Sequence, residues 1–182
     1  MKSLIPPLTD AKIKELHIGD EVTFSGTIYT ARDAAHLRMM DELKQGNELP
    51  FPVQGAVLYY VGPCPAPPGY VIGSAGPTTS SRMDQMTIPL LEAGLKGMIG
   101  KGGRSPDVMA AIAANTAVYF AALGGAGALI AQRIKAVEIV AYQDLGPEAV
   151  HKLTVEDLPA VVAVDSHGGN LYIEGRRTYE TI

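Results

Sequence analysis

Hydrophobic and polar positions alternate most regularly near the start of the chain. Over residues 21–30, EVTFSGTIYT places apolar residues and one glycine on one side and polar or smaller residues on the other. This period of two is typical of a half-buried strand. The next segment has apolar residues at helical spacing, a candidate N-cap at Asp33 and a stop at Gly46. The pattern therefore predicts a strand that leads directly into a helix, and the glycine within the strand, Gly26, suggests a bulge.

Short apolar runs bounded by turn residues recur through the rest of the chain. Strands are predicted at 55–62, 97–101, 116–121 and 137–142, with a C-terminal hairpin formed by 160–165 and 170–175. Helices are predicted from residue 81, interrupted at Pro89 and ended by Gly94, after the cap pair Ser105-Pro106, and at 126–135. Because strands and helices alternate, the expected fold class is α/β with a mixed sheet.

Two segments show neither helical nor strand periodicity in their apolar residues and are predicted to be irregular. Residues 63–70, PCPAPPGY, contain four prolines, which exclude a helix or a central strand and predict a rigid loop. Residues 1–20 are expected to form an irregular N-terminal arm. Glycine and proline are spread along the chain and mark no linker, so residues 1–182 are predicted to be a single domain.

Composition excludes several classes of function. The formal net charge is −4 and the sequence pI is about 5.5, so the chain lacks the basic field that nucleic-acid binding requires. No apolar run reaches the roughly 18 residues of a membrane span, and the start of the chain does not resemble a signal peptide. We expect a cytoplasmic protein without nucleic-acid or membrane partners. The single cysteine, Cys64, cannot hold a metal cluster alone; its place between two prolines favours a packing role.

The densest polar segments suggest where an anion could bind. GPTTSSRMDQ combines a tight turn with a run of hydroxyls, and Arg82 follows Thr78 by one helical turn, so both can face one cavity. In the loop GKGGR, glycines allow close backbone approach and Lys101 supplies a cation. Arg32 stands where a strand passes into a helix, a common place for ligand groups in α/β folds.

Each of these features also has a purely structural interpretation. The hydroxyl run that begins at Thr78 can be a helix cap, Arg32 can form a local ion pair with Asp33, and Lys101 can be a solvated loop tip. The four histidines show no metal-ligand spacing, and neither a GxGxxG nor a Walker pattern is present. From the residues alone, the sequence predicts an α/β domain with loops suited to an anion.

Several motifs, taken together and in order, resemble a known family. GTIYTARDAAHLRM, YYVGPCPAPPG and GPTTSSRMDQMTIPLLEAGLKGMIGKGGRS, followed by GGAGALIAQRIK and the segment up to HGGNLY, are similar to the C-terminal domain of class I fumarases. In two-subunit enzymes that domain is the separate β chain, and the same pattern occurs in β subunits of L-tartrate dehydratase. The resemblance spans roughly residues 15 to 175.

The resemblance assigns roles to four positions. It implies that Arg32, Arg82 and Lys101 bind a C4 dicarboxylate substrate and that Thr78 takes part in proton transfer. It implies no metal ligand in this chain: an oxygen-sensitive [4Fe-4S] cluster would be carried by a partner α subunit, and its open iron would act on the departing hydroxyl. GKGGRS departs from the family variants, which leaves Arg104 without a role.

The resemblance further implies a swivelling β/β/α domain, with a barrel-like mixed sheet and flanking helices, that is active only with its α subunit. The expected activity is the interconversion of (S)-malate and fumarate. Dehydration of L(+)-tartrate is the alternative within the same class, and a non-catalytic anion-binding or regulatory domain is the alternative from another class. The substrate, the activator of Thr78, the subunit stoichiometry and self-association of the isolated chain are left open.

Overall fold

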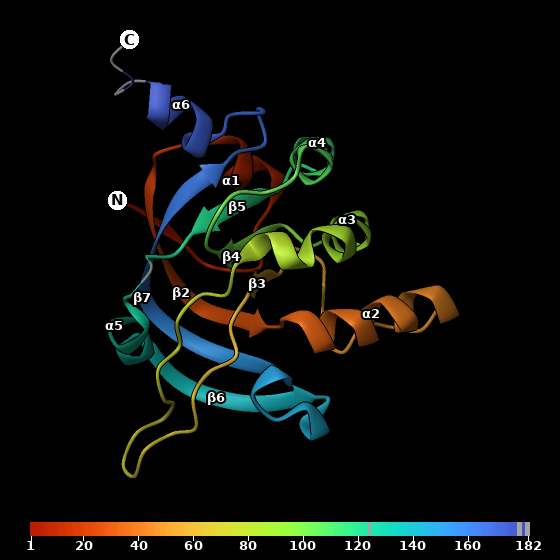
Figure 1. The fold of residues 1–182 in the computed structure, drawn as a ribbon, viewed down its shortest axis with the longest axis vertical. Helices are drawn as coiled ribbons and strands as arrows, with labels where there is room; N and C mark the ends of the chain where they lie inside the picture. The colour runs from red at the N-terminus through yellow and green to blue at the C-terminus, as the bar shows by residue number, and fades with distance from the viewer. Residues whose placement is uncertain (124, 178–179, 181–182) are drawn as a thin grey trace.

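The fold was analysed in a computed structural model that describes residues 1–123, 125–177 and 180 (Figure 1). Within these residues, one sheet of seven strands has the order β1-β2-β3-β4-β5-β7-β6. The strands are β1 (Lys2–Leu4), β2 (Glu21–Thr30), β3 (Val57–Tyr59), β4 (Gly97–Gly100), β5 (Val118–Ala121), β6 (Ile134–Ala141) and β7 (Val150–Val164). The α/β prediction is therefore correct, and the predicted strand 21–30 is confirmed residue for residue.

The sheet closes on itself. β2 to β5 are parallel neighbours, β7 pairs antiparallel with β5, and β7 also pairs antiparallel with β2 along most of its length. Strands β2, β3, β4, β5 and β7 thus form a closed barrel-like sheet. The register between β2 and β7 shifts at Gly26, whose φ is +111°, so the glycine marks the bulge that the sequence suggested.

Short central strands are buried on both faces, which explains their continuous apolar runs. On β3, Val57 and Tyr59 belong to one core cluster, whereas Leu58 belongs to a second. The first cluster fills the barrel, where the rings of Phe24 and Phe120 meet edge to face at 4.9 Å. The second lies between the sheet and the helices.

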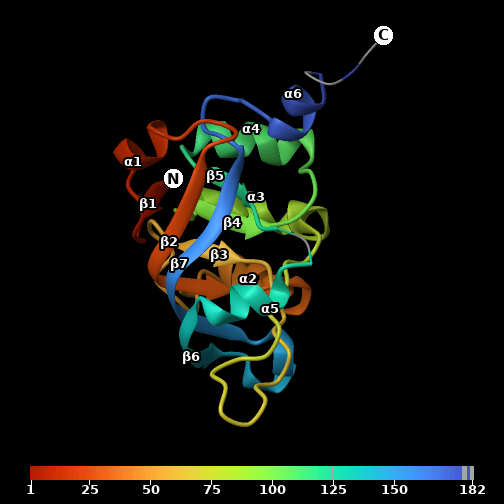
Figure 2. The ribbon, with the colours of Figure 1, turned by 90° about the vertical axis from the view of Figure 1, so that its left-hand side faces the viewer.

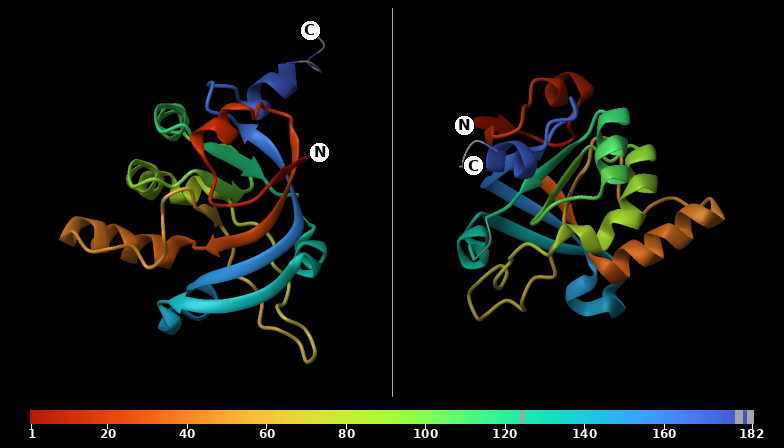
Figure 3. Two further views of the ribbon diagram at one scale, coloured as in Figure 1. Left: turned by 180° about the vertical axis from the view of Figure 1, so that it is seen from behind. Right: turned by 45° about the horizontal axis from the view of Figure 1, so that its top comes forward.

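Three helices, α2 (Asp33–Gln45), α3 (Asp84–Glu92) and α4 (Pro106–Ala114), cover one side of the sheet, as Figures 1, 2 and 3 show. The helix α2 ends at Gly46 in a left-handed conformation, and Ser105 caps α4 through the Val108 N–H, both as predicted. A 3-10 turn, η1 (Ser80–Met83), leads into α3. Pro89 lies inside α3 without interrupting it, because burial of Leu90 and Leu91 compensates for one lost hydrogen bond.

The predicted C-terminal hairpin is wrong. Only the 160–164 part of it is a strand, and it belongs to the long β7; residues 171–177 form helix α6 (Leu171–Arg177). The Asn170 side chain accepts a hydrogen bond from the Tyr172 N–H at 3.0 Å, a helix-starting contact. The only remnant of the hairpin within the described chain is an isolated bridge between Val164 and Asn170.

The N-terminal arm is more regular than expected. It contains β1, which extends the sheet beside β2, and a short helix, α1 (Asp10–Lys14). Leu4, Ile13 and Leu16 are fully buried in the barrel core, so apolar burial rather than local periodicity orders this segment. The remaining elements are α5 (Gly127–Gln132), shorter than the predicted 126–135 helix, and η2 (Gln143–Glu148).

Candidate functional site

The four predicted residues gather where the parallel strands end. Arg32 follows β2 by two residues and Lys101 directly follows β4. Thr78 docks beside β3, because its N–H donates a hydrogen bond to the Tyr60 carbonyl at 2.7 Å. Carboxyl ends of parallel strands share one edge of a sheet, and this edge is where α/β folds bind ligands.

A second set of backbone contacts joins Thr78 to Lys101. The Lys101 N–H donates to the Thr78 carbonyl at 3.3 Å, and the Ser80 N–H donates to the Lys101 carbonyl at 2.9 Å. The approach requires glycine before Lys101, since a Cβ at Gly100 would overlap the Ser80 hydroxyl. The segments of Thr78 and Lys101 therefore lie side by side.

Arg32 and Arg82 share one carboxylate. Arg32 Nε lies 3.2 Å from Asp33 Oδ2, and Arg82 Nε lies 2.9 Å from Asp33 Oδ1. Arg32 also contacts Glu148, with 3.3 Å between Nη2 and Oε1. The local ion pair between Arg32 and Asp33, which was the structural alternative for Arg32, is thus formed. The same Asp33 carboxylate also holds Arg82 close to Arg32.

The charge state of Asp33 follows from these contacts. Partial burial acts to raise the pKa of its carboxyl, but hydrogen bonding at the backbone and the guanidinium groups of Arg32 and Arg82 outweigh it and lower the pKa. Asp33 is therefore ionised at neutral pH and orients both arginines. The Arg32 and Arg82 side chains remain 24% and 51% exposed, so guanidinium edges are left for an anion.

Thr78 and Lys101 have free functional groups. Thr78 is half-buried and Lys101 is exposed. Within residues 1–123, 125–177 and 180, neither the Thr78 hydroxyl nor the Lys101 ammonium has a side-chain or backbone partner. The structural interpretation of Thr78 as a helix cap also fails, because η1 and α3 begin without a side-chain cap bond. Both groups are available to a bound molecule.

Sequence reasoning missed Glu148. Its Oε1 contacts Arg32, and its Oε2 accepts the Ala34 N–H at 2.9 Å, so it satisfies the start of α2, where Arg32 at the N-cap has no side-chain bond to offer. The two residues of that bond are 114 positions apart. No local pattern could have signalled this contact.

The residues that the structure describes do not fit an iron-sulfur cluster or a metal ion held by three or more protein side chains. Cys64, expected to pack, is exposed on the loop between β3 and η1, and such a cluster takes three or four thiolates. In the part of the chain that the structure describes, no group of three His, Cys, Asp or Glu side chains is arranged around a metal position. Nor does any described helix have the length and hydrophobicity needed to cross a bilayer.

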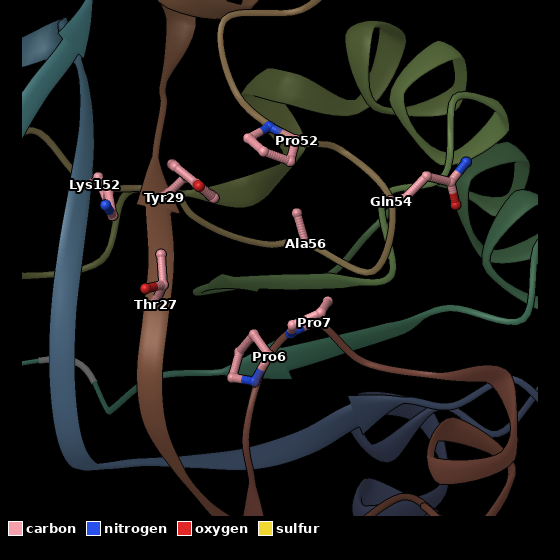
Figure 4. Close-up of a pocket in the computed structure, with 8 residues that line it drawn as sticks. All are labelled: Pro6, Pro7, Thr27, Tyr29, Pro52, Gln54, Ala56 and Lys152. Atoms are coloured by element: carbon pink, nitrogen blue, oxygen red, sulfur yellow. The ribbon is translucent and has the colours of Figure 1, made fainter.

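A hollow of about 280 Å³ lies away from these residues, against β2, β7 and the N-terminal arm (Figure 4). Apolar contributions dominate its walls, and Lys152 is its charged side chain; it is lined by Pro6, Pro7, Thr27, Tyr29, Pro52, Gln54, Ala56 and Lys152. None of the four predicted residues reaches it. The strand-end cluster, with its convergent cations and free hydroxyl, is the better candidate site.

Comparison with known proteins identifies the family of this chain. Residues 3–175 match the family model described as "Fumarase C-terminus". A Methanocaldococcus jannaschii protein provisionally named L(+)-tartrate dehydratase subunit beta is 38% identical over 96% of this chain and 93% of its own length. The anaerobic class I fumarate hydratase of Escherichia coli is 38% identical over 89% of this chain, but over only 30% of its own length.

A third relative, fumarate hydratase 1 of Leishmania major mitochondria, is 40% identical over 83% of this chain and 28% of its own length. The chain therefore spans about a third or less of these two fumarases and nearly all of the archaeal subunit. The resemblance noted from the sequence motifs is confirmed. This chain belongs to the fumarase C-terminus family of hydro-lyase domains.

Proposed function

We propose that this chain is the substrate-binding β subunit of a hydro-lyase that acts on C4 dicarboxylates and interconverts (S)-malate and fumarate. The observation that carries the proposal is the convergence of Arg32, Arg82, Lys101 and Thr78 at one sheet edge through strand ends and the shared Asp33. A domain that had lost its site would have little reason to keep all four, which argues against a non-catalytic regulatory module.

The chemistry of the four side chains suits a C4 dicarboxylate. Planar guanidinium groups bind carboxylates through paired hydrogen bonds, and an ammonium adds a point charge. Arg32 and Arg82 are already oriented by Asp33, so little ordering is needed on binding. Two carboxylates held in this way would fix which carbon of the substrate lies against Thr78.

Thr78 is the proposed participant in proton transfer at the carbon next to the departing hydroxyl. A threonine hydroxyl is a weak base without a carboxylate or similar relay, and the described part of this chain provides no such partner for it. We therefore assign the activating group, and the [4Fe-4S] cluster for which this chain lacks thiolates, to an α subunit. The site would be completed only where the two chains meet.

Tartrate dehydration is the second candidate within the same class. It is favoured by the archaeal relative, whose name says subunit beta of L(+)-tartrate dehydratase and whose length this chain almost fully covers. Both substrates carry two carboxylates, so the cation set accommodates either. The additional hydroxyl of tartrate would be bound by groups other than these four residues.

Reconstitution tests the proposal. The chain is combined anaerobically with an α subunit of this family that carries the three cluster cysteines, and iron and sulfide are supplied. Hydration of fumarate and dehydration of L(+)-tartrate are then measured. We expect turnover of fumarate that requires both chains. Turnover of tartrate alone would transfer the assignment to the second candidate, and a loaded complex inactive on both substrates would overturn the hydro-lyase proposal.

A further inference from the structure

A third arginine, Arg104, lies in the same loop as Lys101 but is buried. Its side chain has no exposed surface. Nε donates to Asp84 Oδ1 at 2.7 Å and Nη2 donates to Thr87 Oγ1 at 2.7 Å, while the guanidinium carbon lies 5.1 Å from the Tyr119 ring centre. A buried charge is tolerated only when it is paired and hydrogen-bonded, and Arg104 meets both conditions without a ligand.

The Asp84 carboxylate also holds the loop itself. Its second oxygen, Oδ2, accepts the Ser105 N–H at 2.7 Å. The loop 101–105 is therefore tied to the start of α3 through both the side chain of Arg104 and the backbone of the next residue. These contacts restrict a loop that is otherwise free to move, because glycines allow many backbone conformations. Gly102 has a φ of +80°, and Gly103 has open space around it.

Tyr119 connects this buried cluster to the residues of the candidate site. Its hydroxyl donates to the Gly102 carbonyl at 2.8 Å and lies 2.9 Å from Ser80 Oγ. Since the phenol has one proton and a carbonyl can only accept, Ser80 is the donor in the second bond. Burial raises the pKa of Tyr119, so the phenol stays protonated and both bonds persist at neutral pH.

Ser80 lies between Thr78 and Arg82, and Gly102 follows Lys101. The Tyr119 hydroxyl thus joins the segment that carries the hydroxyl and one arginine to the segment that carries the lysine. We propose that Arg104, with Asp84 and the Tyr119 hydroxyl, is a positioning residue that holds Lys101 at a fixed place relative to Thr78 and Arg82 without touching the substrate. The inference deepens the proposed function and rests on it.

The Tyr119→Phe variant of the reconstituted complex tests the kinetic side, because it keeps the ring against Arg104 and removes only the bridging hydroxyl. We expect KM to rise about tenfold, as for the loss of one hydrogen bond to a positioned group, with a smaller change in kcat. In a Lys101→Ala background the same substitution should change kcat/KM less than about twofold, because a residue that acts through Lys101 has nothing left to position. Tyr142→Phe is the matched control, since the Tyr142 hydroxyl is buried without a hydrogen-bond partner among the described residues.

Amide hydrogen exchange of the same complexes is independent of turnover. Tyr119→Phe and Arg104→Lys should accelerate exchange at Ser80, Lys101 and Ser105 at least tenfold and leave α2 unchanged. The positioning role would be overturned if Tyr119→Phe changed kcat/KM by the same factor in the wild type and in the Lys101→Ala variant. Unchanged hydrogen exchange at these amides would overturn it as well. An inactive wild-type complex would contradict the proposed function instead, and the exchange data would still decide whether Arg104 orders the loop.

Discussion

Arg104 and Arg82 are both paired with an aspartate, yet the two arginines have opposite uses. Arg104 is fully buried and its donors are occupied by Asp84, Thr87 and Tyr60. Arg82 gives only its Nε to Asp33 and keeps a side chain that is 51% exposed. An arginine whose three nitrogens all donate to buried acceptors builds structure, whereas one that is oriented through a single nitrogen is prepared for an anion.

The electrostatics differ in the same sense. Burial acts to lower the pKa of Arg104, but Tyr60 and Asp84 outweigh it and raise the pKa, so the charge is retained inside the fold. At the strand ends, Asp33 and Glu148 offset part of the charge of Arg32, Arg82 and Lys101, and one formal positive charge is left over before a ligand arrives. Four substitutions test whether the buried region acts on stability and the exposed region on catalysis.

The largest effect is expected at the exposed site, from Thr78→Val. The substitution conserves shape and removes the hydroxyl, so kcat of the reconstituted complex should fall about 10²- to 10⁴-fold, the usual contribution of proton transfer, with KM nearly unchanged. Steady-state kinetics provide the measurement. Thr78→Ser is the matched control and should recover most of the rate; a Thr78→Val enzyme with wild-type kcat would remove Thr78 from the mechanism.

At the buried site, Arg104→Met is expected to act on stability. It leaves Asp84, whose side chain is 12% exposed, without its cation, and breaking such a pair costs about 3–5 kcal/mol of unfolding free energy. Urea denaturation followed by circular dichroism measures this loss. Arg176→Lys, at an exposed pair on α6, is the control. A loss for Arg104→Met no larger than that of the control would mean that the buried pair is not structural.

Arg82→Lys should show the reverse pattern. A lysine retains the charge but loses the planar fork, so kcat/KM should decrease roughly 100-fold while the urea midpoint stays within error of the wild type. Arg38→Lys, at another exposed arginine with an aspartate partner, should preserve both. If Arg82→Lys lowered stability and spared kinetics, the division between the two arginines would be reversed.

The smallest effect concerns His36, which packs edge to face on Tyr60 beneath the site. Burial is the main reason that the pKa of this histidine is lowered from 6.5 to about 4, with a smaller contribution from Arg104. The folded state therefore binds the proton more weakly than the unfolded state, and stability is lost as the pH falls from 6.5 toward 4. At pH 5 the loss should be about 2 kcal/mol.

His36→Phe should make the free energy of unfolding less dependent on pH across that interval, because the variant has no group to protonate on unfolding. Urea titrations at pH 7 and pH 5 give the comparison. His167→Phe serves as the control, since His167 is exposed and its ring stacks on that of His17 at the surface. A variant with the full wild-type pH dependence would show that His36 does not titrate in this way.

The predictable parts of the fold were those with local signals. The alternation in β2, the stop at Gly46 and the Ser105-Pro106 start of α4 depend on neighbours in sequence. The first half of β7 was missed because Asp157 and Pro159 interrupt its pattern, and its identity as a strand comes from pairing with β2 and β6. The helix α6 had a usable signal in Asn170, which an apparent strand pattern obscured.

The candidate site divides in the same way. Arg32, Thr78, Arg82 and Lys101 could be named because their motifs are local and familiar. Glu148 and the Asp84–Arg104 pair could not, since their partners are distant in sequence and meet only after the barrel and its helices have formed. In the sequence, Arg104 and Lys101 are both cations of the glycine-rich loop GKGGR. Only the burial of the Arg104 side chain in the structure distinguishes the two.

The dependence of turnover on this chain is the most direct test of the account. A fixed amount of loaded α subunit is titrated with the chain, and the initial rate of fumarate hydration is recorded anaerobically. We predict no rate without the chain, and a rate that increases linearly up to a fixed ratio of the two subunits and then stays constant. With Arg82→Lys, kcat/KM measured at that ratio should be about 100-fold lower. An α subunit that reaches the full rate alone would contradict the claim that this chain supplies the substrate-binding half of the site.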